Sequence, residues 1–131
     1  MIERYTRKDM GKIWNLENKF QTYLDVELAV CEAYNKLGVI PDDVLIDIKN
    51  KAKFSIERID EIESEVKHDF IAFLSNVSAY VGENSRFLHI GLTSSDVIDT
   101  ALALQIKQAN VIIEKDIEEV IKLLKNKALE Y

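Results

Sequence analysis

The chain has 131 residues, with 17 Lys and Arg against 23 Asp and Glu, so its formal net charge is −6. An acidic chain without a basic cluster lacks the electrostatic footprint of a nucleic-acid-binding protein, so we expect no nucleic-acid partner. No apolar run approaches the roughly 20 residues of a membrane span, and no apolar signal segment opens the chain, so we expect no membrane partner. Because Cys31 is the only cysteine, no internal disulfide can form, which fits a cytoplasmic protein.

Turn-forming residues are scarce, with four glycines and one proline, and this favours an all-α fold over a turn-rich β architecture. The first helical pattern runs from Ile13 to Leu37, where apolar side chains recur every three or four residues. Gly38 stands where a left-handed residue ends a helix, and Pro41 blocks its continuation. The residues of this face are Ile13, Leu16, Phe20, Leu24, Leu28, Cys31 and Tyr34.

Three shorter helices are expected next. The first follows Pro41 and an acidic pair. The second is capped by Ser55 and carries four glutamates on its exposed side, and the third begins at the candidate N-cap Asp69 and ends at Gly82. Their inward residues are Val44, Ile48 and Ala52, then Ile56, Ile59, Ile62 and Val66, then Phe70, Phe73, Leu74, Val77 and Val81.

The last third predicts one long helix, because residues 96–131 contain neither glycine nor proline. About 35 residues at 1.5 Å each give ~52 Å, whereas a compact domain of the preceding 90 residues has a radius of gyration of about 12 Å. We therefore expect a helical bundle completed by further chain or by other subunits. This divides the chain into a helical domain over 1–92 and the start of a bundle domain over 93–131. The predicted inward stripe is Ile98, Leu102, Ile106, Ala109, Ile113, Ile117, Val120, Leu124 and Ala128. It is widened by Val97, Ala101, Leu104, Val111, Ile112, Ile121 and Leu123.

A candidate anion site lies at the start of this long helix. Thr93, Ser94 and Ser95 offer hydroxyl groups beside the free backbone N–H groups of a helix N-terminus, which favour a carboxylate or a phosphate. His89, four residues upstream, can bind an anion or transfer a proton near neutral pH. The plainer alternative is that the hydroxyl run only caps the helix and that His89 is a locally satisfied histidine.

The second histidine, His68, lies between Lys67 and Asp69 at a junction of two predicted helices. It is either a site residue or a surface histidine. Two histidines and one cysteine without close spacing predict no metal site, and four scattered glycines cannot form a phosphate-binding loop. Cys31 falls on an inward helix face and is expected in the core.

Several segments carry a family resemblance. They are the opening from Ile2 to Arg7, the segments 10–14, 17–20 and 37–41, the acidic stretch from Ile62 to Asp69, and the run from His89 to Ala101. Together they resemble the adenylosuccinate lyase family, and the last is similar to a signature of the wider fumarase/aspartase superfamily. The resemblance covers essentially the whole chain in order.

The resemblance implies a lyase of purine nucleotide biosynthesis. Members of the family eliminate fumarate from adenylosuccinate, giving AMP, and from the succinocarboxamide ribotide, giving AICAR. Such a β-elimination needs a base for the proton beside a carboxylate, an acid for the departing nitrogen, and groups that hold the carboxylates. The family implies no metal and no organic cofactor.

The resemblance also assigns the nucleotide side of the site. Arg4 and Tyr5 would bind the nucleotide, Arg4 through its phosphate. His89 would lie beside the same phosphate.

The succinyl side of the site is assigned in the same way. His68 would hydrogen-bond near the reacting succinyl group and assist the reaction, with Lys67 and Asp69 lining the site. Thr93 and Ser94 would grip a succinyl carboxylate at the helix N-terminus.

The family is several times longer than this chain and forms homotetramers whose active sites combine three subunits. The histidine acid and the serine base of the family lie in the part that has no counterpart here. The chain therefore resembles an N-terminal fragment, expected to be inactive alone and to self-associate. The alternative is a non-catalytic helical interaction module of the same fold.

Overall fold

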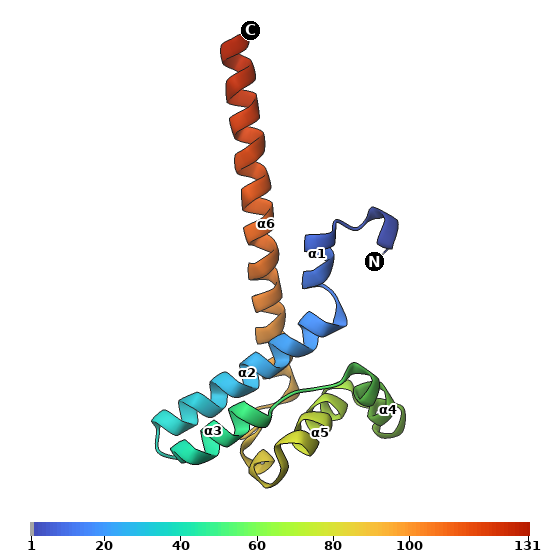
Figure 1. The fold of residues 1–131 in the computed structure, drawn as a ribbon, viewed down its shortest axis with the longest axis vertical. Helices are drawn as coiled ribbons and strands as arrows, with labels where there is room; N and C mark the ends of the chain where they lie inside the picture. The colour runs from blue at the N-terminus through green and yellow to red at the C-terminus, as the bar shows by residue number, and fades with distance from the viewer. Residues whose placement is uncertain (1) are drawn as a thin grey trace.

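The computed structural model describes residues 2–131, and helices are the regular elements of that part of the chain. A short 3-10 helix, η1 (Glu3–Tyr5), precedes α1 (Lys8–Ile13) and α2 (Leu16–Lys36). The next helices are α3 (Asp42–Lys51), α4 (Ile56–Val66), α5 (Asp69–Val81) and the 3-10 helix η2 (Gly82–Phe87). The chain ends in α6 (Ser94–Glu130), a rod that rises from a base formed by α2 to α5 (Figure 1). The expected all-α fold is confirmed.

The core of the base is an aromatic cluster between α2 and α5. Phe20 stacks on Phe73 with ring centroids 5.7 Å apart, and Tyr23 meets Phe73 edge-on at 5.5 Å. Phe70 lies 5.6 Å from Tyr23. Such pairs add directional contacts to the burial of apolar area, so they fix the start of α5 against the first half of α2.

The predicted continuous helix over 13–37 is interrupted near its start. Ile13 ends α1, and α2 begins only after Asn15, whose side chain accepts a hydrogen bond from the Asn18 N–H at 2.8 Å. The side-chain cap satisfies a free N–H of the new helix, which favours a fresh start over continuation. At the other end the prediction is confirmed, because Gly38 has a φ of 75°.

The junctions around α4 and α5 differ in one detail from the prediction. Ser55 caps α4 as expected, accepting from the Arg58 N–H at 3.3 Å. The N-cap of α5, however, is His68 and not Asp69: the His68 Nδ1 accepts from the Ile71 N–H at 3.4 Å. Asp69 is the first helical residue, and its carboxylate accepts from the Phe70 N–H at 2.7 Å. A carboxylate in the first turn is favourable there too, so the two positions compete for the cap.

The long helix is confirmed, with 37 residues in α6, and Ala109 is buried as predicted, but before Ala109 the centre of the predicted inward stripe is displaced by one residue. The buried positions are Val97, Ala101, Gln105 and Ala109, while Leu102 and Ile106 are nearly half exposed. The reason lies in the break before α2. The Ile13 carbonyl at the end of α1 accepts from the Gln105 Nε2 at 2.7 Å and from the Asn18 Nδ2 at 2.8 Å. The amide of Gln105 therefore has to face inward.

None of the helices in residues 2–131 is long and apolar enough to cross a membrane. The boundary between residues 92 and 93 coincides with the start of α6 after its N-cap Thr93. The division into two domains stays a prediction.

Candidate functional site

The predicted anion site lies in the loop that joins η2 to α6. This loop turns sharply, because His89 has a φ of 62° and Gly91 a φ of 71°, and the Leu92 N–H donates to the His89 carbonyl at 3.4 Å. A positive φ is uncommon for a residue other than glycine. The turn holds His89 within one loop of the N-terminus of α6, as predicted.

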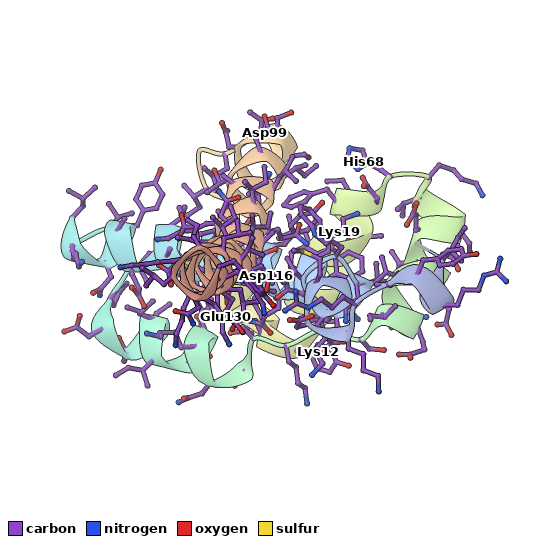
Figure 2. All side chains as sticks on the ribbon, turned by 90° about the horizontal axis from the view of Figure 1, so that it is seen from above. Lys12, Lys19, His68, Asp99, Asp116 and Glu130 are labelled. Carbon is purple, nitrogen blue, oxygen red and sulfur yellow. The ribbon has the colours of Figure 1, made fainter. Side chains whose placement is uncertain are left out.

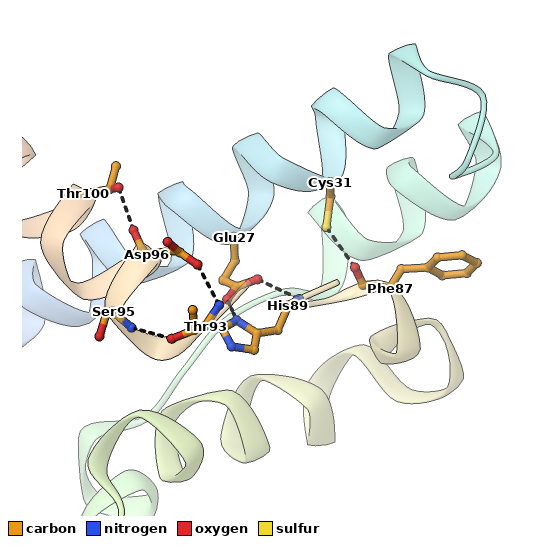
Figure 3. A network of polar contacts seen from close by, with 8 residues as sticks. All are labelled: Glu27, Cys31, Phe87, His89, Thr93, Ser95, Asp96 and Thr100. Carbon is orange, nitrogen blue, oxygen red and sulfur yellow. Dashed lines mark hydrogen bonds and ion pairs between the residues drawn. The ribbon is translucent and has the colours of Figure 1, made fainter. Parts of the chain in front are cut away.

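A buried glutamate holds His89 in this conformation. The Glu27 side chain is 1% exposed, and its Oε1 lies 2.7 Å from the His89 Nδ1. Its Oε2 accepts a hydrogen bond from the His89 backbone N–H at 2.8 Å. The imidazole, 16% exposed, lies on its other side against the Phe70 ring, with 5.0 Å between centroids. One carboxylate therefore fixes both the backbone and the ring of His89 (Figure 3).

The N-terminus of α6 is capped by its own side chains. The Thr93 hydroxyl accepts from the Ser95 N–H at 3.4 Å, and the Asp96 carboxylate accepts from the Thr93 N–H at 2.8 Å. This reciprocal capping box agrees with the alternative that the hydroxyl residues cap the helix. The cap occupies a lone pair of the Thr93 oxygen and leaves its O–H as a donor, so a carboxylate can still bind there.

The start of α5 faces the same region. Phe70, which touches the His89 ring, follows His68 by two residues. His68 is 50% exposed. In the view along α6, His68 and Asp99 project toward the same edge of the molecule, so the starts of α5 and α6 open to one side (Figure 2).

Burial, together with the charge of Asp69, raises the pKa of the Tyr23 phenol to about 12.

Lys67 and Asp69 flank His68 at the junction of α4 and α5. Lys67 ends α4 in the left-handed conformation, with a φ of 55°. The His68 Nδ1 lies 3.7 Å from the Asp69 Oδ1, which is too long for a hydrogen bond. The Lys67, His68 and Asp69 side chains are thus exposed around one tight turn.

Arg4 and Tyr5 are not brought to this cluster. They lie on η1, where the Arg4 guanidinium stacks 4.6 Å from the centroid of the Tyr5 ring. Among the polar contacts of residues 2–131, none joins either side chain to a histidine or to Thr93. The arm is tied elsewhere, since Arg7 forms an ion pair with Asp116 on α6. Their expected role stays a prediction.

Cys31 lies in the core, as predicted. The thiol is 1% exposed, and its Sγ lies 3.7 Å from the Phe87 carbonyl. Burial, reinforced by the charge of Glu27, raises the pKa of Cys31 to about 11. A thiol held neutral in this way is a poor nucleophile.

Glu27 is the residue that the sequence prediction missed. It lies on the inward face of the predicted 13–37 helix, between Leu24 and Cys31 at spacings of three and four. A carboxylate on an apolar face is rare unless it is paired. The presence of a carboxylate on the apolar face was therefore the available signal for a buried, paired Glu27. This signal does not identify His89 as the partner.

Comparison with known proteins shows the family of the chain. A family model described as a lyase matches residues 3–131. The chain belongs to this lyase family. It is 53% identical over 131 residues to the adenylosuccinate lyase of Synechocystis sp., covering 100% of this chain and 30% of that protein. It is 53% identical over 134 residues to the adenylosuccinate lyase of Aquifex aeolicus, covering 100% of this chain and 31% of that protein.

A third relative and a solved structure complete the comparison. The adenylosuccinate lyase of Staphylococcus saprophyticus is 48% identical over 131 residues, covering 100% of this chain and 30% of that protein. The crystal structure of fumarate lyase from Mesorhizobium sp. BNC1 superposes with a TM-score of 0.78 at 28% identity, covering 86% of this chain and 27% of that one. The resemblance seen in the sequence is confirmed, and the chain spans about a third of the length of these relatives.

Proposed function

We propose that the chain forms the substrate-binding N-terminal part of an adenylosuccinate lyase. The reaction is the β-elimination of fumarate from adenylosuccinate to give AMP, and from the succinocarboxamide ribotide to give AICAR. The observation that carries the proposal is the identity of 48–53% to adenylosuccinate lyases over this whole chain. The gathering of His89, the α6 N-terminus and the His68 turn on one side of the base supports it.

The succinyl half of the substrate would lie between the starts of α5 and α6. Thr93 and Ser94 would hold a carboxylate, because the N–H groups and the positive end of a 37-residue helix favour an anion. His68 would donate a hydrogen bond near the reacting carbon, within reach of Lys67 and Asp69. Carboxylate contacts of this kind lower the energy of the carbanion that forms when the proton leaves.

The nucleotide half would be held by Arg4, Tyr5 and His89. Because η1 is apart from the histidines, Arg4 and Tyr5 would serve either a rearranged arm or a site shared between subunits. We propose a homotetramer in the cytoplasm, in which neighbouring subunits complete each site. The reaction is proposed to need neither a metal nor an organic cofactor.

The principal acid and base are proposed to lie in the part of the relatives that this chain does not span. Both histidines of the chain have one ring nitrogen engaged in the fold, and Cys31 is buried with a raised pKa. We expect the purified 131-residue chain to release no AMP or fumarate from adenylosuccinate. Release at a rate typical of enzymes, about 1–1000 per second, would contradict this part of the proposal.

A second candidate is a helical interaction module without catalysis. It is favoured by the apolar side chains exposed along the outer half of α6, including Ile113, Ile117 and Val120. Such a face is typical of a surface that meets partner helices.

Nucleotide binding distinguishes the two candidates. Adenylosuccinate titrated into the chain, followed by backbone amide NMR, is expected to shift signals at the start of α6 saturably, because Thr93 and Ser94 are proposed to hold its succinyl carboxylate. Arg4→Ala and Thr93→Ala should weaken binding, while Lys12→Ala, an exposed cation on α1, should not. Shifts that are equal in all four proteins would support the interaction module instead.

A further inference from the structure

The two histidines of this chain are held by opposite kinds of partner. The His89 Nδ1 lies 2.7 Å from a carboxylate oxygen of Glu27. The His68 Nδ1 accepts a hydrogen bond from the backbone N–H of Ile71. In a neutral imidazole one nitrogen donates and the other accepts, and the partner decides which is which.

The protons at the buried pair follow from what each group can do. The Glu27 Oε2 already accepts from the His89 backbone N–H at 2.8 Å, and an ionised carboxylate only accepts. With Glu27 ionised, the contact between Oε1 and Nδ1 requires a hydrogen on Nδ1. At His68 the reverse holds, since the backbone N–H of Ile71 supplies the hydrogen and Nδ1 must be bare.

We propose that Glu27 is a positioning residue that fixes His89 as the Nδ1–H tautomer and presents its Nε2 to ligand, while the α5 cap fixes His68 as the Nε2–H tautomer. What these two tautomers mean for substrate binding rests on the proposed function. His68 then offers a hydrogen-bond donor even when neutral, which suits a carboxylate. His89 offers the lone pair of its Nε2, which can take a proton from a phosphate monoester, whose second pKa is about 6. The protonated ring then binds the phosphate through a charge-assisted hydrogen bond. The nearby Glu27 carboxylate balances the charge that the ring then gains.

The tautomers can be read directly, because the chain has only two histidines. Long-range ¹H–¹⁵N correlation NMR of the ¹⁵N-histidine-labelled chain, at a pH where both rings are neutral, resolves four ring nitrogens. We expect a protonated Nδ1 in His89 and a protonated Nε2 in His68. A His68→Gln variant assigns the two rings. Finding His89 as the Nε2–H form would overturn the proposal without any further variant.

Glu27→Gln supplies a sharper test with almost no change in shape. An amide has one accepting oxygen and one donating nitrogen, so it cannot accept from both the His89 N–H and Nδ1–H. Since the backbone N–H is a fixed donor, the oxygen should turn to it and the NH₂ to Nδ1. His89 should then switch to the Nε2–H tautomer while His68 stays unchanged. Asp25→Asn, the same chemical change at an exposed site two residues away, should leave both rings as they were.

A folded Glu27→Gln protein in which His89 keeps Nδ1–H would contradict the assignment. The proposed function is tested separately by adding AMP to the same labelled sample. Shifted His89 Nε2 signals in the wild type and reduced shifts in Glu27→Gln support the positioning role. Unshifted signals with the expected tautomers count against the proposed nucleotide contact and leave the tautomer assignment standing.

Discussion

Gly38 and Gly91 share a backbone conformation but not an environment. Their φ values are 75° and 71°, so alanine is strained at both. A Cβ at Gly38 meets nothing within 4 Å, whereas one at Gly91 lies 2.7 Å from the Tyr34 Oη. The glycine of the site loop is therefore fixed by packing as well as by conformation.

Substituting alanine for each glycine separates the cost of the left-handed conformation from the cost of the clash with Tyr34. We expect Gly38→Ala to lower the free energy of unfolding by about 1 kcal/mol, the cost of the left-handed conformation. Gly91→Ala should cost about 1–3 kcal/mol more, because Tyr34 must move. Urea unfolding measures both. Equal losses would show that the Tyr34 contact has no energetic weight, and Tyr34→Phe should restore part of the Gly91→Ala loss.

Two buried acids make stability fall at alkaline pH. Burial raises the pKa of Cys31 from 9.0 to about 11 and that of Tyr23 from 10.0 to about 12. The unfolded chain loses these protons first, so stability is fully present below pH 9 and is lost as the pH rises to about 12. Thermal melts from pH 8 to 12 should show this fall, and Tyr23→Phe should remove its upper part. A flat profile in the wild type would contradict the burial of both groups.

At the level of elements, the sequence predicts helices well and their inward faces less well. The run without glycine or proline predicts the length of α6, and Gly38 predicts the end of α2. In the buried face of α6, Val97, Ala101 and Ala109 fit the apolar pattern, whereas Gln105 escapes it. Small and polar residues face inward there, where the α1–α2 break leaves a carbonyl that needs a donor. Glu27 escapes for the same reason, since its role depends on a loop 62 residues away.

The face of α6 can be checked by paired substitutions at neighbouring positions. Ala101→Leu should overpack the contact with α2 and lower the free energy of unfolding by about 1–3 kcal/mol. Leu102→Ala, at a half-exposed position, should change the stability of the monomer by about 0.5 kcal/mol or less. Urea unfolding at low protein concentration gives both values. A larger loss of unfolding free energy for Leu102→Ala than for Ala101→Leu would instead support the inward stripe predicted from the sequence.

For the whole molecule, the outer half of α6 is the part that its own chain covers least (Figure 1). A shallow apolar hollow of about 260 Å³ lies along it, lined by Ile113, Asp116, Ile117, Val120 and Ile121. Exposed apolar patches of this kind favour association.

We expect the chain to self-associate at micromolar concentration through this face. Sedimentation velocity should show species larger than the monomer. Ile117→Lys should shift the protein toward monomer, because it places a charge in the hollow, whereas Ile46→Lys on α3, which is somewhat more exposed, should not. A wild-type protein that sediments as a monomer, or equal effects of the two lysines, would contradict this.

The central claim is that these residues form the substrate-binding part of an adenylosuccinate lyase. The most direct test is a chimera in which this chain replaces the matching 131 residues of the Synechocystis adenylosuccinate lyase. The account predicts that the chimera converts adenylosuccinate to AMP and fumarate, and that His68→Ala or Thr93→Ala within it reduces kcat/KM by at least about tenfold, or ~1.4 kcal/mol. A chimera that assembles like its parent but forms no fumarate would contradict the account.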